Sequence, residues 1–192
     1  MSALPAAAIG LLVLGLAIYA TLLYNGLIRL RNNNDRAFAN IDVLLKQRHD
    51  EVLNLVAAVK GYMDHERQAL EIVTQARTAS ISAASVSQKA RADFLMTGAL
   101  HTLFAVAERY PTLKANQSFL ALQNRISELE ERIADRREFF NDDVATYNTR
   151  IDQIPELLLA RLMKLQPRQF FKVSAEDRQQ VEVRLARAQG TS

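Results

Sequence analysis

The three histidines of this chain are the side chains best suited to acid–base catalysis or metal binding, but their spacing favours neither. His49, His65 and His101 lie far apart, and the sequence has neither the Glu-x-x-His pair of bundle di-metal sites nor the His-Glu-x-x-His zinc motif. His65 stands between Asp64 and Glu66, and adjacent residues on a helix point ~100° apart. We therefore interpret this triplet as a solvated helix face.

Motifs for other common chemistries are also missing from the sequence. Without cysteine no thiolate metal site can form, and there is no glycine-rich phosphate loop or Gly-x-Ser-x-Gly elbow. Glu130–Glu131 and Asp142–Asp143 are interpreted as surface charge, with a weak cation site as the alternative. The balance of 24 Lys and Arg against 21 Asp and Glu gives no case for nucleic-acid binding. We expect a protein that is not an enzyme and needs no cofactor.

The residues before the first charge, Arg29, form an apolar segment long enough to cross a membrane. Residues 4–27 provide the ~20 apolar residues that a spanning helix needs, and a span in lipid must be helical. A secretory signal has a basic start and only 7–15 apolar residues. We therefore expect residues 1–3 to form a short extracytoplasmic N-terminus and residues 4–27 to be retained as a transmembrane helix.

The charges beside this segment predict its orientation. Tyr24 lies where interfacial aromatic rings collect, and Arg29, Arg31 and Arg36 follow it against the single Asp35. Lys and Arg in short flanks remain in the cytoplasm. We therefore expect a single-pass protein with its N-terminus outside and the rest of the chain in the cytoplasm.

The rest of the chain carries helix signals, and no alternating strand pattern or Asn-Gly or Asp-Gly hairpin turn occurs. Apolar residues spaced three and four apart run through residues 27–73, so we expect the transmembrane helix to continue without interruption to Arg77. Asn34, Arg48 and Glu66 fall in this seam, where polar residues cost stability and more often set register or partner than do chemistry.

Further helices are expected after a Ser/Ala-rich stretch at residues 78–87, which we interpret as a partly helical connection instead of a mobile docking loop. A second helix is expected over residues 88–110, ended by Pro111. A third is expected from Asn116 or Ser118 to Ile154.

The segment after Pro155 has two interpretations. Its mixture of basic and apolar residues is typical of an interfacial helix that binds anionic lipid. The alternative, which we favour, is a last bundle helix with snorkelling basic side chains. The residues expected to contact lipid in the first case are Arg161, Lys164, Arg168, Phe170, Phe171 and Lys172. A final short helix is expected from Ser174.

Several segments resemble the LemA family of bacterial membrane-anchored helical proteins. They are YNGLIRLRNNNDRAFANIDVLLKQR at residues 24–48, NLVAAVKGYMDHE at 54–66, AERYPTLKANQSFLALQ at 107–123, and the pairs Phe140–Asn141 and Tyr147–Asn148. The polar residues of these motifs are Asn25, Asp35, Asp42, Arg48, Asn54, His65, Glu66, Asn141 and Asn148. Phe140 stands where the family usually has tyrosine, and the tail after Pro155 diverges.

The resemblance implies an all-α fold in which the N-terminal transmembrane helix continues into an elongated antiparallel four-helix bundle. The bundle would cover residues 28–166, and residues 167–192 would form a C-terminal tail with a short helix. It also implies the bacterial cytoplasmic membrane and no established catalysis. One branch of the family is linked with magnetosome membrane formation and other members with membrane-protein quality control.

We therefore expect a membrane-organising scaffold that self-associates through its long helices; the alternative is an adaptor that regulates another membrane protein, such as a protease or sensor. The expected partners are membrane lipid, further copies of the chain and, for an adaptor, that membrane protein. Asn141 and Asn148, like Asp35 and Asp42, are one heptad apart. They could set helix register, which we favour, or pair with a second protomer.

Overall fold

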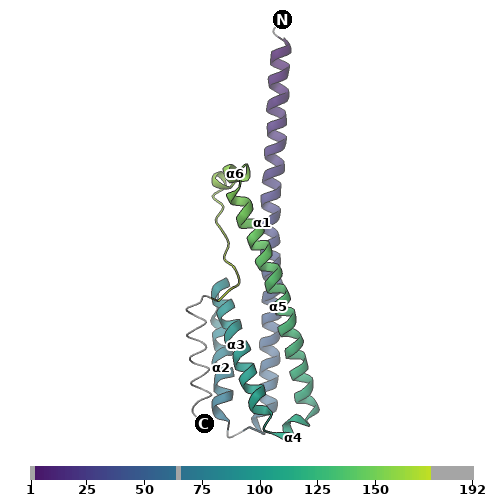
Figure 1. Cartoon of the computed structure of the whole chain (residues 1–192), viewed down its shortest axis with the longest axis vertical. Helices are drawn as coiled ribbons and strands as arrows, with labels where there is room; N and C mark the ends of the chain where they lie inside the picture. The colour runs from purple at the N-terminus through teal and green to yellow at the C-terminus, as the bar shows by residue number, and fades with distance from the viewer. Residues whose placement is uncertain (1–2, 64–65, 174–192) are drawn as a thin grey trace. The chain divides into compact units, whose positions relative to one another are not determined.

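The computed structural model describes residues 3–63 and 66–173, which are mostly helical (Figure 1). These residues contain no β-strand, so the all-α prediction is confirmed. The helices are α1 (Ala3–Lys60), α2 (Arg67–Ser82), α3 (Val86–Ala107), α4 (Pro111–Lys114), α5 (Gln117–Asp152) and α6 (Glu156–Leu162). The short helix expected from Ser174 lies outside the described residues.

The helices are organised in two compact units. Among the described residues, the first unit combines 3–38 with 140–168, and the second combines 39–63 and 66–139 with 169–173. Because α1 and α5 each cross the boundary between these ranges, both helices contribute to both units.

The first helix is shorter than expected. It ends at Lys60, so the prediction of one helix continuing to Arg77 was wrong. Gly61 follows, and glycine costs ~1 kcal/mol in a helix relative to alanine. The next two amide groups both donate to the Val59 carbonyl at 3.0 Å, which closes the last turn. The apolar seam continues on α2, where Val73 is fully buried.

The second unit has one large apolar core and a smaller cluster of Leu44, Leu129 and Ile133. The four long helices α1, α2, α3 and α5 all contribute to the large core, as does the short α4. Its fully buried members include Val52, Leu55, Val59, Val73, Leu100, Leu103, Leu113 and Ile126. The fourth long helix is therefore α2. Within residues 156–173, the segment that we favoured as a last bundle helix supplies only the seven-residue α6.

Side-chain caps define where two of these helices begin. Ser85 accepts from the Gln88 amide at 3.2 Å, and the Gln88 side chain accepts from the Ser85 amide at 3.1 Å, which forms a capping box before α3. Residues 78–82 belong to α2, so the Ser/Ala-rich stretch is partly helical, as predicted. Asn116 caps α5, as predicted, by accepting from the amides of Ser118 and Phe119 at 2.9 and 3.2 Å.

The first unit has a smaller core in which α1, α5 and α6 meet. It contains Leu27 of α1, Tyr147 and Ile151 of α5, and Ala160 of α6, all buried. Ile154, which was predicted to end the α5 seam, lies beyond that helix and is 80% exposed.

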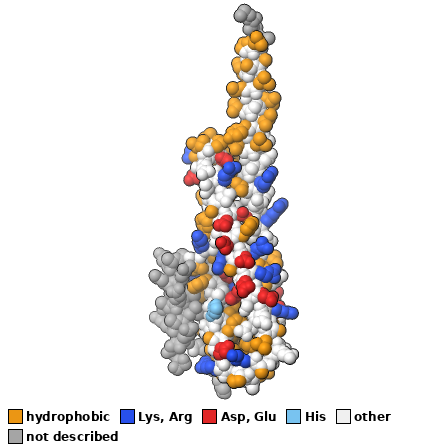
Figure 2. Space-filling view, turned by 45° about the vertical axis from the view of Figure 1, so that its right-hand side comes forward, with side chains coloured by type: hydrophobic (Ala, Val, Ile, Leu, Met, Phe, Trp, Pro, Cys, Tyr) orange, Lys and Arg blue, Asp and Glu red, His pale blue; other side chains and the backbone are white. Residues whose placement is uncertain are grey.

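The N-terminal part of α1 is bare and apolar (Figure 2). All residues from Leu4 to Leu22 are exposed, and their segment contains a window with a mean hydropathy of 2.3 and no buried residue. By length and composition this helix can cross a membrane.

Candidate functional site

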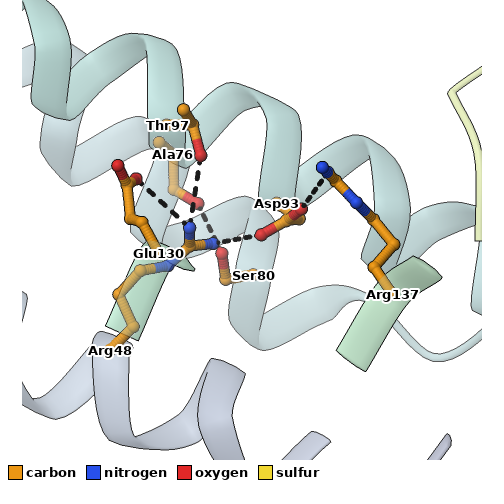
Figure 3. A network of polar contacts seen from close by, with 7 residues as sticks. All are labelled: Arg48, Ala76, Ser80, Asp93, Thr97, Glu130 and Arg137. Atoms are coloured by element: carbon orange, nitrogen blue, oxygen red, sulfur yellow. Dashed lines mark hydrogen bonds and ion pairs between the residues drawn. The ribbon is translucent and has the colours of Figure 1, made fainter. Parts of the chain in front are cut away.

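The most extensive buried polar site is an ion-pair network around Arg48 in the second unit (Figure 3). Arg48 is only 3% exposed; its Nη2 donates to Asp93 Oδ1 at 2.6 Å, and its Nη1 donates to the Thr97 hydroxyl at 3.2 Å. Nη1 also reaches Glu130 Oε1 at 3.5 Å, and Arg137 Nη1 lies 3.3 Å from Asp93 Oδ2. Two guanidinium groups thus face two carboxylates, so the network is close to neutral.

Three helices bring these side chains together. Arg48 occupies an apolar seam position of α1, four residues before the buried Val52. Asp93 lies among buried residues of α3, and α5 carries Glu130 and Arg137 one heptad apart on the same face. Because a buried charge needs a partner, the network holds α1, α3 and α5 in one register.

A cavity of about 250 Å³ lies beside this network. It is lined by Asp42, Leu45, Lys46, Arg48, His49, Ser80, Ile81, Ala83, Lys89, Ala92, Asp93 and Met96. Several of its polar groups are already engaged: Arg48 with Asp93, and Lys89 with Asp42. The cavity is smaller than the ~300–1,000 Å³ typical of ligand pockets. Most of the charged side chains that line it already form ion pairs with each other.

His49 also lines the cavity and acts there as a neutral acceptor. Burial lowers the pKa of His49, and the nearby Arg77 lowers it further against the opposing effect of Asp50. Arg77 Nε accordingly donates to His49 Nε2 at 3.2 Å. Within residues 3–63 and 66–173, no group of three or more His, Asp or Glu side chains could hold a metal ion.

The other two polar residues of the predicted seam contact other parts of the chain. Asn34 is fully buried, and its Nδ2 donates to the backbone carbonyl of Asp143 on α5 at 3.2 Å, so it links α1 to α5. Glu66, just before α2, accepts from Arg109 Nη2 at 3.0 Å and from the Tyr110 hydroxyl at 3.1 Å. These two partners lie in the connection between α3 and α4.

In the first unit, the motif residue Asn148 fixes the chain that follows α6. Its Nδ2 donates to the carbonyl of Arg168 at 3.0 Å, and its Oδ1 accepts from the amide of Arg168 at 2.8 Å. The Arg168 guanidinium pairs with Asp35 at 2.6 Å and lies 5.8 Å from the centre of the Tyr147 ring. These contacts hold the segment after α6 against α1 and α5, and we call them the clamp.

We expect Asn148→Ala to release this clamp without unfolding the protein. Two hydrogen bonds of ~1 kcal/mol each would be lost, so the Arg168 amide should exchange its hydrogen faster in the full-length protein. Asn54→Ala is the matched control, because Asn54 is exposed on α1. Unchanged exchange at Arg168 in Asn148→Ala would contradict the clamp.

The two aspartates of one heptad pair contact separate basic partners. Asp35 pairs with Arg168, and Asp42 pairs with Lys89. Asn141 is half-buried on α5. The remaining predicted residues of α1 are exposed on its surface: Tyr24, Asn25, Arg29, Arg31, Arg36 and Asn54. His65 lies outside the described residues.

The predicted lipid contacts divide into exposed and internal residues. Arg161 and Lys164 are exposed, whereas Phe171 is 2% exposed and packs within the protein, which corrects its assignment. Arg168 is engaged by the clamp. Phe170 is 37% exposed, and Lys172 Nζ lies 5.0 Å from the centre of its ring.

Sequence reasoning missed three charged members of the buried network. Asp93, Glu130 and Arg137 were not identified, and Glu130 was interpreted as surface charge although only 23% of its side chain is exposed. The sequence contained one signal of this network, Asp93. It is a carboxylate three residues before Met96 in an apolar helix, and a buried carboxylate needs a buried cation as its partner.

Known proteins are similar in sequence to this chain over most of its length. The model of the LemA family matches residues 37–185. Magnetosome protein MamQ 2 of Paramagnetospirillum magneticum is 25% identical over 184 residues, which cover 81% of this chain and 68% of the relative. Magnetosome protein MamQ of Magnetospirillum gryphiswaldense is 24% identical over 188 residues, covering 83% of this chain and 69% of the relative. These similarities and the bare apolar part of α1 fit a membrane protein.

Proposed function

The chain belongs to the LemA family, and on this premise we propose that it is a non-enzymatic membrane scaffold that self-associates through its long helices. In this proposal it is a single-pass protein of the bacterial cytoplasmic membrane. Residues 4–27 anchor it, and Arg29, Arg31 and Arg36 retain the following domain in the cytoplasm by the positive-inside rule.

The observation that carries self-association is a second stripe on α1, separate from the buried seam. We call it the lateral face, and its residues are Ala39, Val43, Gln47, Asp50, Asn54 and Ala57, all exposed. Their spacing of three and four places them on one side of the helix. The lateral face has a single charge, Asp50, and its largest apolar side chain, Val43, is 57% exposed.

A second copy is the partner that fits this face best. Copies held in one membrane by the same span all point in the same direction, and confinement raises their effective concentration. Small side chains such as Ala39 and Ala57 allow two helices to approach closely. Weak contacts along the lateral face are then enough to assemble the anchored protein.

Cross-linking in membranes tests this proposal, and the absence of cysteine from the chain makes single-cysteine variants unambiguous. Full-length Val43→Cys should form a disulfide-linked dimer on mild oxidation, because equivalent positions of two lateral faces meet. Ala134→Cys, exposed on the charged side of α5, is the matched control and should remain monomeric. The products are resolved by non-reducing electrophoresis.

The competing outcomes are distinct. A dimer formed equally at both positions would indicate random collision and contradict the lateral face as the contact. A Val43→Cys product with a different protein, without a homodimer, would favour the adaptor function. Val43→Asp in the otherwise native chain should also reduce the particle size after mild detergent extraction.

A further inference from the structure

One edge of α6 is apolar and uncovered. Leu158 and Leu162 are 68% and 79% exposed, and they are four residues apart on one face of the helix. Ile154, just before α6, is 80% exposed. The opposite side of α6 is packed, because Ala160 is buried in the core of the first unit.

The helix α6 lies at the level beyond which α1 is drawn alone (Figure 1). Leu27 is the first buried residue of α1 among those described, and it belongs to the same cluster as Ala160 and Leu159 of α6. The bare apolar stretch of α1 precedes Leu27 directly. If that stretch crosses the bilayer, as proposed above, α6 lies at the membrane surface.

Contacts at both ends hold α6 in this position. At its start, Arg150 Nη2 lies 3.0 Å from Glu156 Oε1. After its end, Asn148 and Asp35 bind Arg168, as described above. The apolar edge is therefore presented in a fixed orientation, which lowers the entropy cost of docking it.

The charges of residues 156–172 suit an anionic surface. Glu156 is the only acidic residue in the segment 156–172, and it is 6% exposed and paired with Arg150. Arg161 and Lys164 are both exposed. A short helix with an apolar edge and exposed basic residues is the pattern of segments that lie in the interface of a bilayer with anionic lipid.

We propose that Ile154, Leu158 and Leu162 insert between the lipid headgroups beside the transmembrane segment, with Arg161 and Lys164 at the lipid phosphates. This inference rests on the proposed anchoring by α1. It assigns lipid contact to the exposed edge of α6, in place of Arg168, which pairs with Asp35, and of the buried Phe171.

Spin labels in the full-length protein test this assignment. Single-cysteine variants Leu158→Cys and Leu162→Cys carry a nitroxide, and the protein is reconstituted in phosphatidylcholine vesicles that contain phosphatidylglycerol. Collision with oxygen, which concentrates in lipid, and with a water-soluble nickel chelate is measured by electron paramagnetic resonance. Leu16→Cys in the bare part of α1 is the lipid control, and Ala134→Cys on α5 is the aqueous control.

The expected result is a loss of chelate collisions and a gain of oxygen collisions at positions 158 and 162 relative to position 134. Arg161→Gln with Lys164→Gln should reduce that difference. Labels at 158 and 162 that behave like position 134, while position 16 stays in lipid, would overturn the α6 proposal and leave the anchor intact. Immobilised labels shielded from both reagents would indicate a protein contact and also overturn it. An aqueous signal at position 16 would instead refute the anchoring.

Discussion

Leu14→Arg is expected to remove most of the protein from the membrane. Leu14 is in the middle of the bare part of α1 and is 57% exposed, so the new charge has no protein partner. A charge at the centre of a spanning helix costs ~2.5–3.5 kcal/mol on insertion scales. Since 1.4 kcal/mol is a factor of ten, the insertion equilibrium should fall roughly 60- to 300-fold.

The measurement is the fraction of protein that remains in the membrane pellet after alkaline carbonate extraction. Val43→Arg is the matched control, because Val43 has the same exposed fraction of 57% on the same helix but lies outside the apolar segment. It should stay in the pellet even if assembly is impaired. Equal retention of the Leu14→Arg and Val43→Arg variants would show that the apolar segment does not anchor the chain.

Asp93→Ala is expected to be the most destabilising single change in the second unit. It leaves Arg48, 3% exposed, without its closest carboxylate. Removing one partner of a buried ion pair typically costs ~3–5 kcal/mol. The Glu130 carboxylate, 3.5 Å from Arg48, compensates only in part, because it is more exposed and more distant than Asp93.

The effect is measured as a lower denaturation midpoint in detergent, followed by the helical circular dichroism signal. Lys114→Ala is the control: Lys114 pairs with Glu108 on the surface, and exposed pairs contribute less than ~1 kcal/mol. Combining Arg48→Met with Asp93→Leu should restore most of the stability, since an apolar replacement leaves no buried charge. Equal midpoints for Asp93→Ala and Lys114→Ala would refute the structural importance of the network.

The sequence predicted the buried faces of the helices better than their ends. Spacing of three and four correctly identified Val52 and Val73 as core residues, because the same face of a helix must be apolar wherever it packs. The same spacing continues past Lys60, so it does not indicate that the helix ends before Gly61. A glycine costs only ~1 kcal/mol in a helix, yet α1 ends just before Gly61 and α2 forms a separate helix.

Partners across helices were the hardest part of the site to predict. Arg48 was recognised as a polar residue in an apolar seam, but its partner Asp93 lies 45 residues further along the chain. Only the packing of α1 against α3 brings them together. The burial of Phe171 depends in the same way on tertiary packing, since residues 163–173 are not helical and have no periodicity that could indicate an inner side.

A protein anchored by one helix alone can tilt freely where that helix leaves the bilayer. The edge of α6 would add a second lipid contact beside α1, and this contact would restrict the tilt. Each copy would then keep a constant inclination to the membrane plane. Neighbouring copies would lose less orientational entropy when they meet, so a narrow contact between them would be enough for an ordered array.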